Sequence, residues 1–167
     1  RIVDANDVES YALSILEDPE EKNLLFLGTD DGLYISTNAG SSWMKWTHGF
    51  PTVSVKDLVI QPREHDLVIG TFGRAAWVLD DIRPLRAIAQ NNNILNSSIT
   101  VFEAPTAYQA AYQQPTGSRF GADAMYQGEN REYGAAISYF YKASETAKTE
   151  KASEEDDSDN KDDKDET

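Results

Sequence analysis

Residues 17–29 and 60–71 repeat one pattern, and this repeat limits the fold more than any other feature of the sequence. In each copy a polar turn with a proline, Pro19 or Pro62, precedes an apolar run that ends in Gly-Thr. The prolines lie 43 residues apart and the glycines 42 residues apart. A period of about 40–45 residues is typical of one four-stranded sheet in a repeat array. Such a sheet cannot bury both of its faces alone, so we expect it to stack on a neighbour.

Each repeat contains short apolar runs separated by turn residues, the pattern of antiparallel strands. The Asp-Gly pair before residue 33 is a strong hairpin signal. The expected strands cover residues 11–16, 24–27, 33–36 and 43–46 in the first unit and 55–60, 67–70 and 75–80 in the second. A short helix is expected over 85–94, after Pro84, and a strand over 99–102 as the outer strand of the second unit. The sequence therefore predicts an all-β fold, a partial β-propeller of about two four-stranded blades, within residues 1–103.

The turn after the third strand has the form Ser-x-Asn-x-Gly-x-x-Trp, made by Ser36, Asn38, Gly40 and Trp43. The side chain of Asn38 can bond nearby backbone amides and hold a tight bend. Gly40 allows a positive φ without steric cost. Trp43 can then pack its ring over the hairpin. These roles are structural, so we do not expect the turn to carry chemistry.

This motif resembles the Asp-box, or BNR repeat, of β-propellers such as sialidases, sortilin-like receptors and xyloglucanases. It differs at Asn38, where Asp is usual, and at Ser42, where Thr is usual, and both replacements keep a hydrogen-bonding side chain. Together with the stretches 28–34, 57–63, 70–81 and 128–135, it makes residues 10–141 similar to the C-terminal part of sortilin-like BNR proteins. The resemblance implies a secreted or periplasmic protein, with a signal peptide and the remaining blades of its own propeller upstream.

The C-terminal third differs from the repeats in composition. Residues 104–133 are rich in Ala, Gln, Tyr and Gly, and we expect a linker that wraps the propeller. Residues 134–144 contain a β-like run, interpreted as the first strand of a truncated immunoglobulin-like β-sandwich. Residues 145–167 hold eleven Asp or Glu and four Lys without large apolar side chains, which predicts a disordered acidic tail. A calcium site in this tail is the weaker alternative, because the spacing lacks the EF-hand loop pattern.

Charge and composition exclude several classes of function. The formal net charge is −14 and no Lys/Arg cluster is present, which argues against nucleic-acid binding. No run approaches the roughly twenty apolar residues of a membrane helix, so no membrane span is expected. The chain has no Cys, and His48 and His65 lie in different loops, so neither a metal site nor a cofactor is predicted.

Candidate binding residues lie in the loops opposite the Asp-box turn and in the crossover between the blades. They are Asp30, Asp31, Phe72, Arg74 and His48. The two acids could bind a cation, a sugar hydroxyl or a basic peptide, although Asp before Gly is also ordinary hairpin chemistry. Arg74 could hold a carboxylate in a bidentate geometry. The structural alternative for Arg74 is an ion pair with Asp80 or Asp81 in a neighbouring segment.

Two further groups of residues have both a structural and a functional interpretation. Asp80 and Asp81 resemble the paired acids of glycosidases, but adjacent strand residues point to opposite faces, so a turn before Pro84 is favoured for Asp81. Trp77, like Trp43, falls at a packing position, whereas Trp46 is kept as a possible exposed ring for a sugar.

The function predicted from these observations is binding of a peptide, protein or glycan by an extracytoplasmic β-propeller. One alternative is a glycoside hydrolase acting on a polysaccharide, as in xyloglucanases. A second alternative is a purely structural role in which these blades only close the ring. Fold does not imply function, so the choice depends on the residues at the ligand face.

Overall fold

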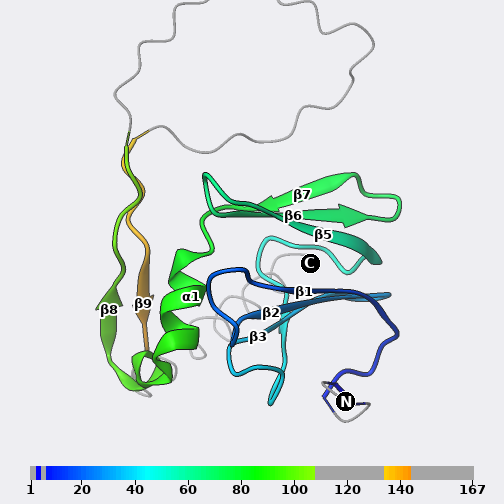
Figure 1. Cartoon of the computed structure of the whole chain (residues 1–167), viewed down its shortest axis with the longest axis horizontal. Helices are drawn as coiled ribbons and strands as arrows, with labels where there is room; N and C mark the ends of the chain where they lie inside the picture. The colour runs from blue at the N-terminus through cyan, green and yellow to red at the C-terminus, as the bar shows by residue number, and fades with distance from the viewer. Residues whose placement is uncertain (1–2, 5–6, 108–133, 144–167) are drawn as a thin grey trace, which may run out of the picture.

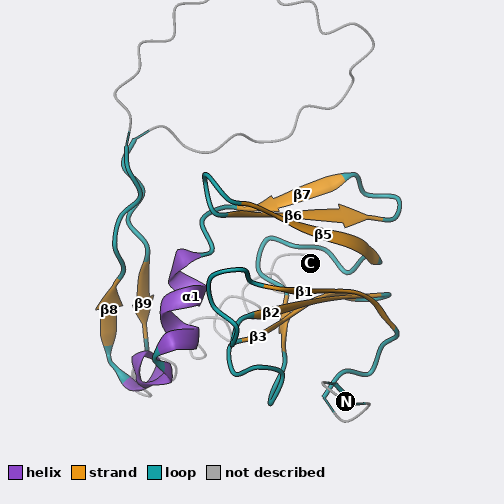
Figure 2. Ribbon diagram, viewed as in Figure 1, coloured by secondary structure: helices purple, strands orange, loops and turns teal. Residues whose placement is uncertain are grey.

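The computed structural model describes residues 3–4, 7–107 and 134–143, and its strands are antiparallel throughout. The all-β prediction is confirmed, with one short α-helix (Figures 1 and 2). The first sheet contains β1 (Ala12–Glu17), β2 (Leu25–Thr29), β3 (Gly32–Ser36) and β4 (Met44–Trp46). The second sheet contains β5 (Val55–Gln61), β6 (Asp66–Thr71) and β7 (Ala76–Leu79), and the chain continues into α1 (Arg83–Gln90) and the 3₁₀ helix η1 (Asn92–Asn96). The predicted acidic tail and nearly all of the predicted linker lie outside the described residues.

The second sheet repeats the hydrogen-bonding register of the first. Ile15 pairs with Leu27 in β1–β2, and Leu58 pairs with Ile69 at the equivalent place in β5–β6. Both pairs of strands carry a register shift at the same point, before Ser14 in β1 and before the equivalent residue of β5. A bulge conserved between repeats is a feature of the unit and not a local defect. The repeat seen in the sequence is therefore one structural unit, used twice.

The two sheets stack face to face, with β1 and β2 against β5 (Figure 1). The main core lies between them and is lined by apolar side chains of both sheets and of the crossover 47–54. Its buried members are Leu24, Phe26, Leu33, Ile35, Phe50, Val53, Val55, Leu58, Leu67, Ile69, Ile82 and Ala89. Both sheets are oriented in the same way along the stack. Phe26 of the first sheet faces the second sheet, and the equivalent residue of the second sheet, Val68, faces away from the first sheet. Each sheet thus has an inner face, in this core, and an outer face.

The turn between β3 and β4 has the geometry that its residues predict. The amide of Gly40 donates to Ser36 Oγ at 2.9 Å, and the amide of Ser42 donates to Asn38 Oδ1 at 2.9 Å. Gly40 has a φ of 84°, so the requirement for a glycine is confirmed. Trp43 packs on the outer face of the first sheet against a small cluster of Val8, Leu27 and Tyr34. This turn is structural, as expected.

Two expectations for the C-terminal part need correction. The strand β8 (Ile99–Val101) does not complete the second sheet; it pairs with β9 (Tyr139–Tyr141) in a separate two-stranded ribbon. The second sheet therefore has three strands, because the chain turns after β7 into α1 where the first sheet has its turn and β4. Pro84 lies at the start of α1, so the helix prediction is confirmed, although η1 forms its last part.

Candidate functional site

Five candidate residues lie at one end of the two-sheet stack. Thr29 pairs with Gly32 at this end of the first sheet, and Gly70 pairs with Ala76 at the same end of the second. The crossover 47–54 joins β4 to β5 here, as Figure 1 shows. This end, called the loop end, therefore brings together Asp30, Asp31, His48, Phe72 and Arg74. The β3–β4 turn lies at the opposite end, where Leu25 pairs with Ser36.

Asp31 is the candidate with the most defined surroundings. Its Oδ2 accepts a hydrogen bond from Lys45 Nζ at 2.7 Å, and its Oδ1 accepts from Thr29 Oγ1 at 2.7 Å. Lys45 is held in place because β4 pairs with β3 so that Lys45 lies opposite Tyr34, and its ammonium is 5.7 Å from that ring's centroid. Sequence reasoning missed Lys45 and Thr29. The hairpin register β3–β4 was the available signal, since it places Lys45 one strand away from the Asp-Gly turn.

The electrostatics of this cluster favour the charged pair. Burial raises the pKa of Asp31, but hydrogen bonds from Lys45 and Thr29 and the positive charge of Lys45 outweigh it, so the pKa is lowered. The hydrogen bond to Asp31 raises the pKa of Lys45. Burial and the negative charge of Asp31 raise the pKa of Tyr34. The carboxylate of Asp31 is thus stabilised as an anion at neutral pH and already holds one cation.

We expect Asp31→Asn to destabilise the fold slightly at neutral pH and to lose that effect in acid. A carboxyl whose folded-state pKa is lowered contributes stability above its unfolded pKa of about 3.9 and loses it as the pH falls through the folded pKa. The side chain is 39% exposed, so the effect is below about 1 kcal/mol. Urea unfolding of both proteins at neutral and at acid pH measures it, with Asp30→Asn as the neighbouring control. A difference that does not change with pH would contradict the assignment.

The other loop-end residues are more exposed. Arg74 lies in the β6–β7 turn and is exposed. Its backbone carbonyl accepts a hydrogen bond from Trp77 Nε1 at 3.0 Å. Phe72 is 74% exposed, with Lys56 Nζ 5.8 Å from the ring centroid. His48 is exposed in the crossover. The loop end thus presents separate acidic, basic and aromatic groups.

The structure bears on three of the alternatives drawn from the sequence. Asp81 pairs with Arg83 at 2.6 Å at the far end of β7, so the alternative of an ion pair between Arg74 and Asp81 is wrong. The Asp81 side chain is 13% exposed and also accepts from the Arg83 amide at 3.4 Å, which confirms its turn role. Trp46 is not a free surface ring, because it packs against the main core.

A buried charged cluster at the other end of the stack was not foreseen. Arg86 of α1 binds both carboxylate oxygens of Asp18, with Nε–Oδ1 3.1 Å, Nε–Oδ2 3.0 Å and Nη2–Oδ2 2.9 Å. The third nitrogen of the same guanidinium reaches Glu20 Oε1 at 2.9 Å and His65 Nδ1 at 2.7 Å. Since an arginine only donates, His65 Nδ1 accepts in this contact. The sequence held two indications of this cluster: an Arg within an otherwise apolar helix face, and an Asp directly after a strand.

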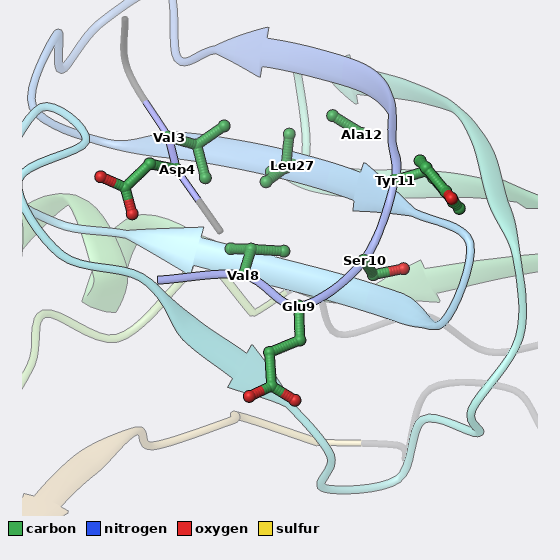
Figure 3. Close-up of a pocket in the computed structure, with 8 residues that line it drawn as sticks. All are labelled: Val3, Asp4, Val8, Glu9, Ser10, Tyr11, Ala12 and Leu27. Carbon is green, nitrogen blue, oxygen red and sulfur yellow. The ribbon is translucent and has the colours of Figure 1, made fainter. Parts of the chain in front are cut away.

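A hollow opens on the outer face of the first sheet beside the Asp30–Asp31 turn, since Tyr11 lines it and the Tyr11 carbonyl accepts a hydrogen bond from the Asp30 amide at 3.1 Å (Figure 3). Val3, Val8 and Leu27 gather around it, and the carboxylates of Asp4 and Glu9 point away from it. Asp4, Glu9, Ser10 and Tyr11 carry the polar groups of the lining, but their polar ends point in different directions, unlike the converging groups of a specific small-molecule site. Among the residues with a described position, no group of three or more His, Asp or Glu is arranged to hold a metal ion.

Comparison with protein-family models, curated proteins and solved structures found no match to this chain. The similarity to BNR proteins therefore rests on the sequence motifs and stays a prediction. Fold and geometry define an all-β chain of stacked antiparallel sheets, with charged and aromatic side chains gathered at one end. Neither α1 nor any other helix in the described ranges is long and apolar enough to cross a bilayer.

Proposed function

We propose that the two sheets are neighbouring blades of a BNR-type β-propeller that binds a peptide, protein or glycan ligand outside the cytoplasm. The observation that carries the proposal is the repeat of register, bulge and stacking direction between the two sheets. Blades arranged around a common axis repeat in this way, and a closed propeller needs four to eight of them. Further sheets of the same kind are therefore part of the proposal.

The loop end is the proposed ligand surface. Its residues come from turns and a crossover carried by rigid strands, which is where binding residues most often lie. Arg74 is exposed and offers a planar, bidentate donor for a carboxylate, and Phe72 offers an exposed ring. Asp31 is already paired with Lys45, so Asp30 is the acid that remains accessible at the turn. These groups suit a ligand with both polar and apolar parts.

Binding of the 167-residue chain to peptide and glycan arrays tests this function. Arg74→Ala and Asp30→Asn are expected to reduce the signal of any true ligand by about tenfold or more. Arg63→Ala is the matched control, because Arg63 is another exposed arginine, in the β5–β6 turn at the opposite end. Equal losses in Arg74→Ala and Arg63→Ala, or no ligand that distinguishes them, would contradict a loop-end site.

A further inference from the structure

Within the residues that the structure describes, each sheet has one face with apolar side chains and no second sheet against it. On the outer face of the second sheet, Val59, Val68 and Val78 form a row across β5, β6 and β7. Val59 is 55% exposed and Val78 54% exposed. A contiguous apolar row of this kind on a sheet face indicates an interaction surface.

The equivalent row in the first sheet is buried, and this shows what such a row packs against. Leu16, Phe26 and Ile35 occupy the positions of the three valines, and Phe26 and Ile35 are 0% and 1% exposed. They lie in or against the main core, which residues of the second sheet, the crossover 47–54 and α1 complete. The valine row therefore has the position and the apolar character of a surface that packs on another sheet of this repeat.

The outer face of the first sheet is the complementary surface. Ile15 is 52% exposed, whereas its equivalent Leu58, which packs on the first sheet, is 6% exposed. On this face Val8 packs against Leu27 and Tyr34. Phe50 packs in a similar way on the second sheet, where its ring meets Trp77, the equivalent of Tyr34, edge-on with the ring centroids 5.5 Å apart. The hollow of Figure 3 lies on this face, beside β1.

We propose that a second copy of this chain supplies the missing sheet, and that copies associate head to tail through these two faces. The outer face of the second sheet of one copy packs on the outer face of the first sheet of the next, as the two sheets pack within one chain. The proposal rests on the repeat geometry used in the proposed function and not on any ligand. Such a heterologous contact leaves one face open at each end, so growth leads to a ring or an open chain.

The contact is weaker than the internal one for two reasons. Glu17 lies on the outer face of the first sheet where its equivalent in the second sheet, Ile60, packs against the core. The net charge of −14 also makes the copies repel one another. Association is therefore expected to depend on concentration and to strengthen with salt.

Sedimentation velocity of the full 167-residue chain and of two single-face variants tests this proposal. Val78→Lys places a charge on one face and Ile15→Lys on the other; both positions are exposed, so each monomer should fold. The unmodified chain is expected to form larger species as its concentration rises, and each variant alone to associate at least about tenfold more weakly. Leu95→Lys is the control, since Leu95 is a 41% exposed residue of η1 on neither face.

Mixing the two variants is the decisive measurement. Each keeps the face that the other has lost, so an equimolar mixture is expected to form a dimer that grows no further. A mixture that stays monomeric, or variants that still associate alone, would overturn head-to-tail association. A monomeric unmodified chain at every concentration would also overturn it and leave further sheets, of this protein or of another, to cover these faces. If the mixed dimer forms but no ligand binds in the array experiment, the proposed ligand surface is wrong and head-to-tail association stands.

Discussion

Arg86→Met is expected to lower the free energy of unfolding by about 3–5 kcal/mol, the largest effect of any single change considered for this chain. Asp18 is fully buried, and Arg86 supplies the positive charge and three hydrogen bonds to its carboxylate. Without Arg86, a buried carboxylate loses its counter-ion, and α1 loses its polar tie to the first sheet. Chemical denaturation followed by tryptophan fluorescence measures the loss.

Asp18→Asn is expected to rescue part of that loss in the double variant. The Asp18 carboxylate also accepts hydrogen bonds from the amides of Glu20 and Glu21, at 2.9 and 2.8 Å, and an Asn oxygen can keep these bonds without a buried charge. Arg83→Met is the matched control on the same helix, because its 33% exposed side chain pairs with Asp81 near the surface, and such pairs contribute less than about 1 kcal/mol. Additive effects of the Asp18 and Arg86 changes would show that the pair does not act as a unit.

Gly28→Ala is expected to destabilise the fold by about 2–3 kcal/mol, because β5 of the second sheet packs closely against this glycine. A Cβ on Gly28 would overlap Ser14 Oγ and would lie 2.6 Å from Val55 Cγ1 and 2.8 Å from the Val55 carbonyl oxygen. The serine side chain can rotate, but the Val55 contacts involve a fully buried residue and its backbone. The sheets would have to separate, and the main core would lose contacts.

Gly70→Ala is the matched control, since Gly70 is the same residue of the repeat in the second sheet. A Cβ there would come no closer than 3.5 Å to Asp57, which is ordinary contact. We expect this variant to be neutral or slightly more stable, because alanine restricts the unfolded chain more than glycine does. Equal destabilisation by the two changes in urea titrations would contradict the close packing of the sheets at Gly28.

Much of the local structure followed from the sequence. The turn Ser36–Trp43 has the hydrogen bonds that Asn38 and Gly40 predicted, since these bonds join residues within a few positions of one another. The hairpin at Gly32, the four strands of the first repeat and the first three of the second also formed as expected, because apolar runs and Asp-Gly turns act locally. The loop-end residues share one end of the stack because alternate turns of antiparallel strands must lie at the same edge.

The surroundings of the candidate residues were less predictable. The sequence indicated Asp31 as a candidate but not its partner, because Lys45 approaches through the register of a third strand. The ion pair between Arg74 and Asp81, one alternative for that arginine, does not form because the length of β7 separates the two residues. Trp46 was kept as a possible exposed ring, but it packs against the main core.

The sequence by itself determined the repeat unit, its strands and its turns, because period, apolar runs and turn residues act over short stretches of chain. Only the tertiary structure decided which distant residues meet. Arg86 and Asp18 lie 68 positions apart, and nothing in either local pattern requires their pairing. The pairing of β8 with β9 and the exposure of the valine row depend in the same way on which surfaces the stacked sheets leave uncovered, since burial is a property of the packed whole.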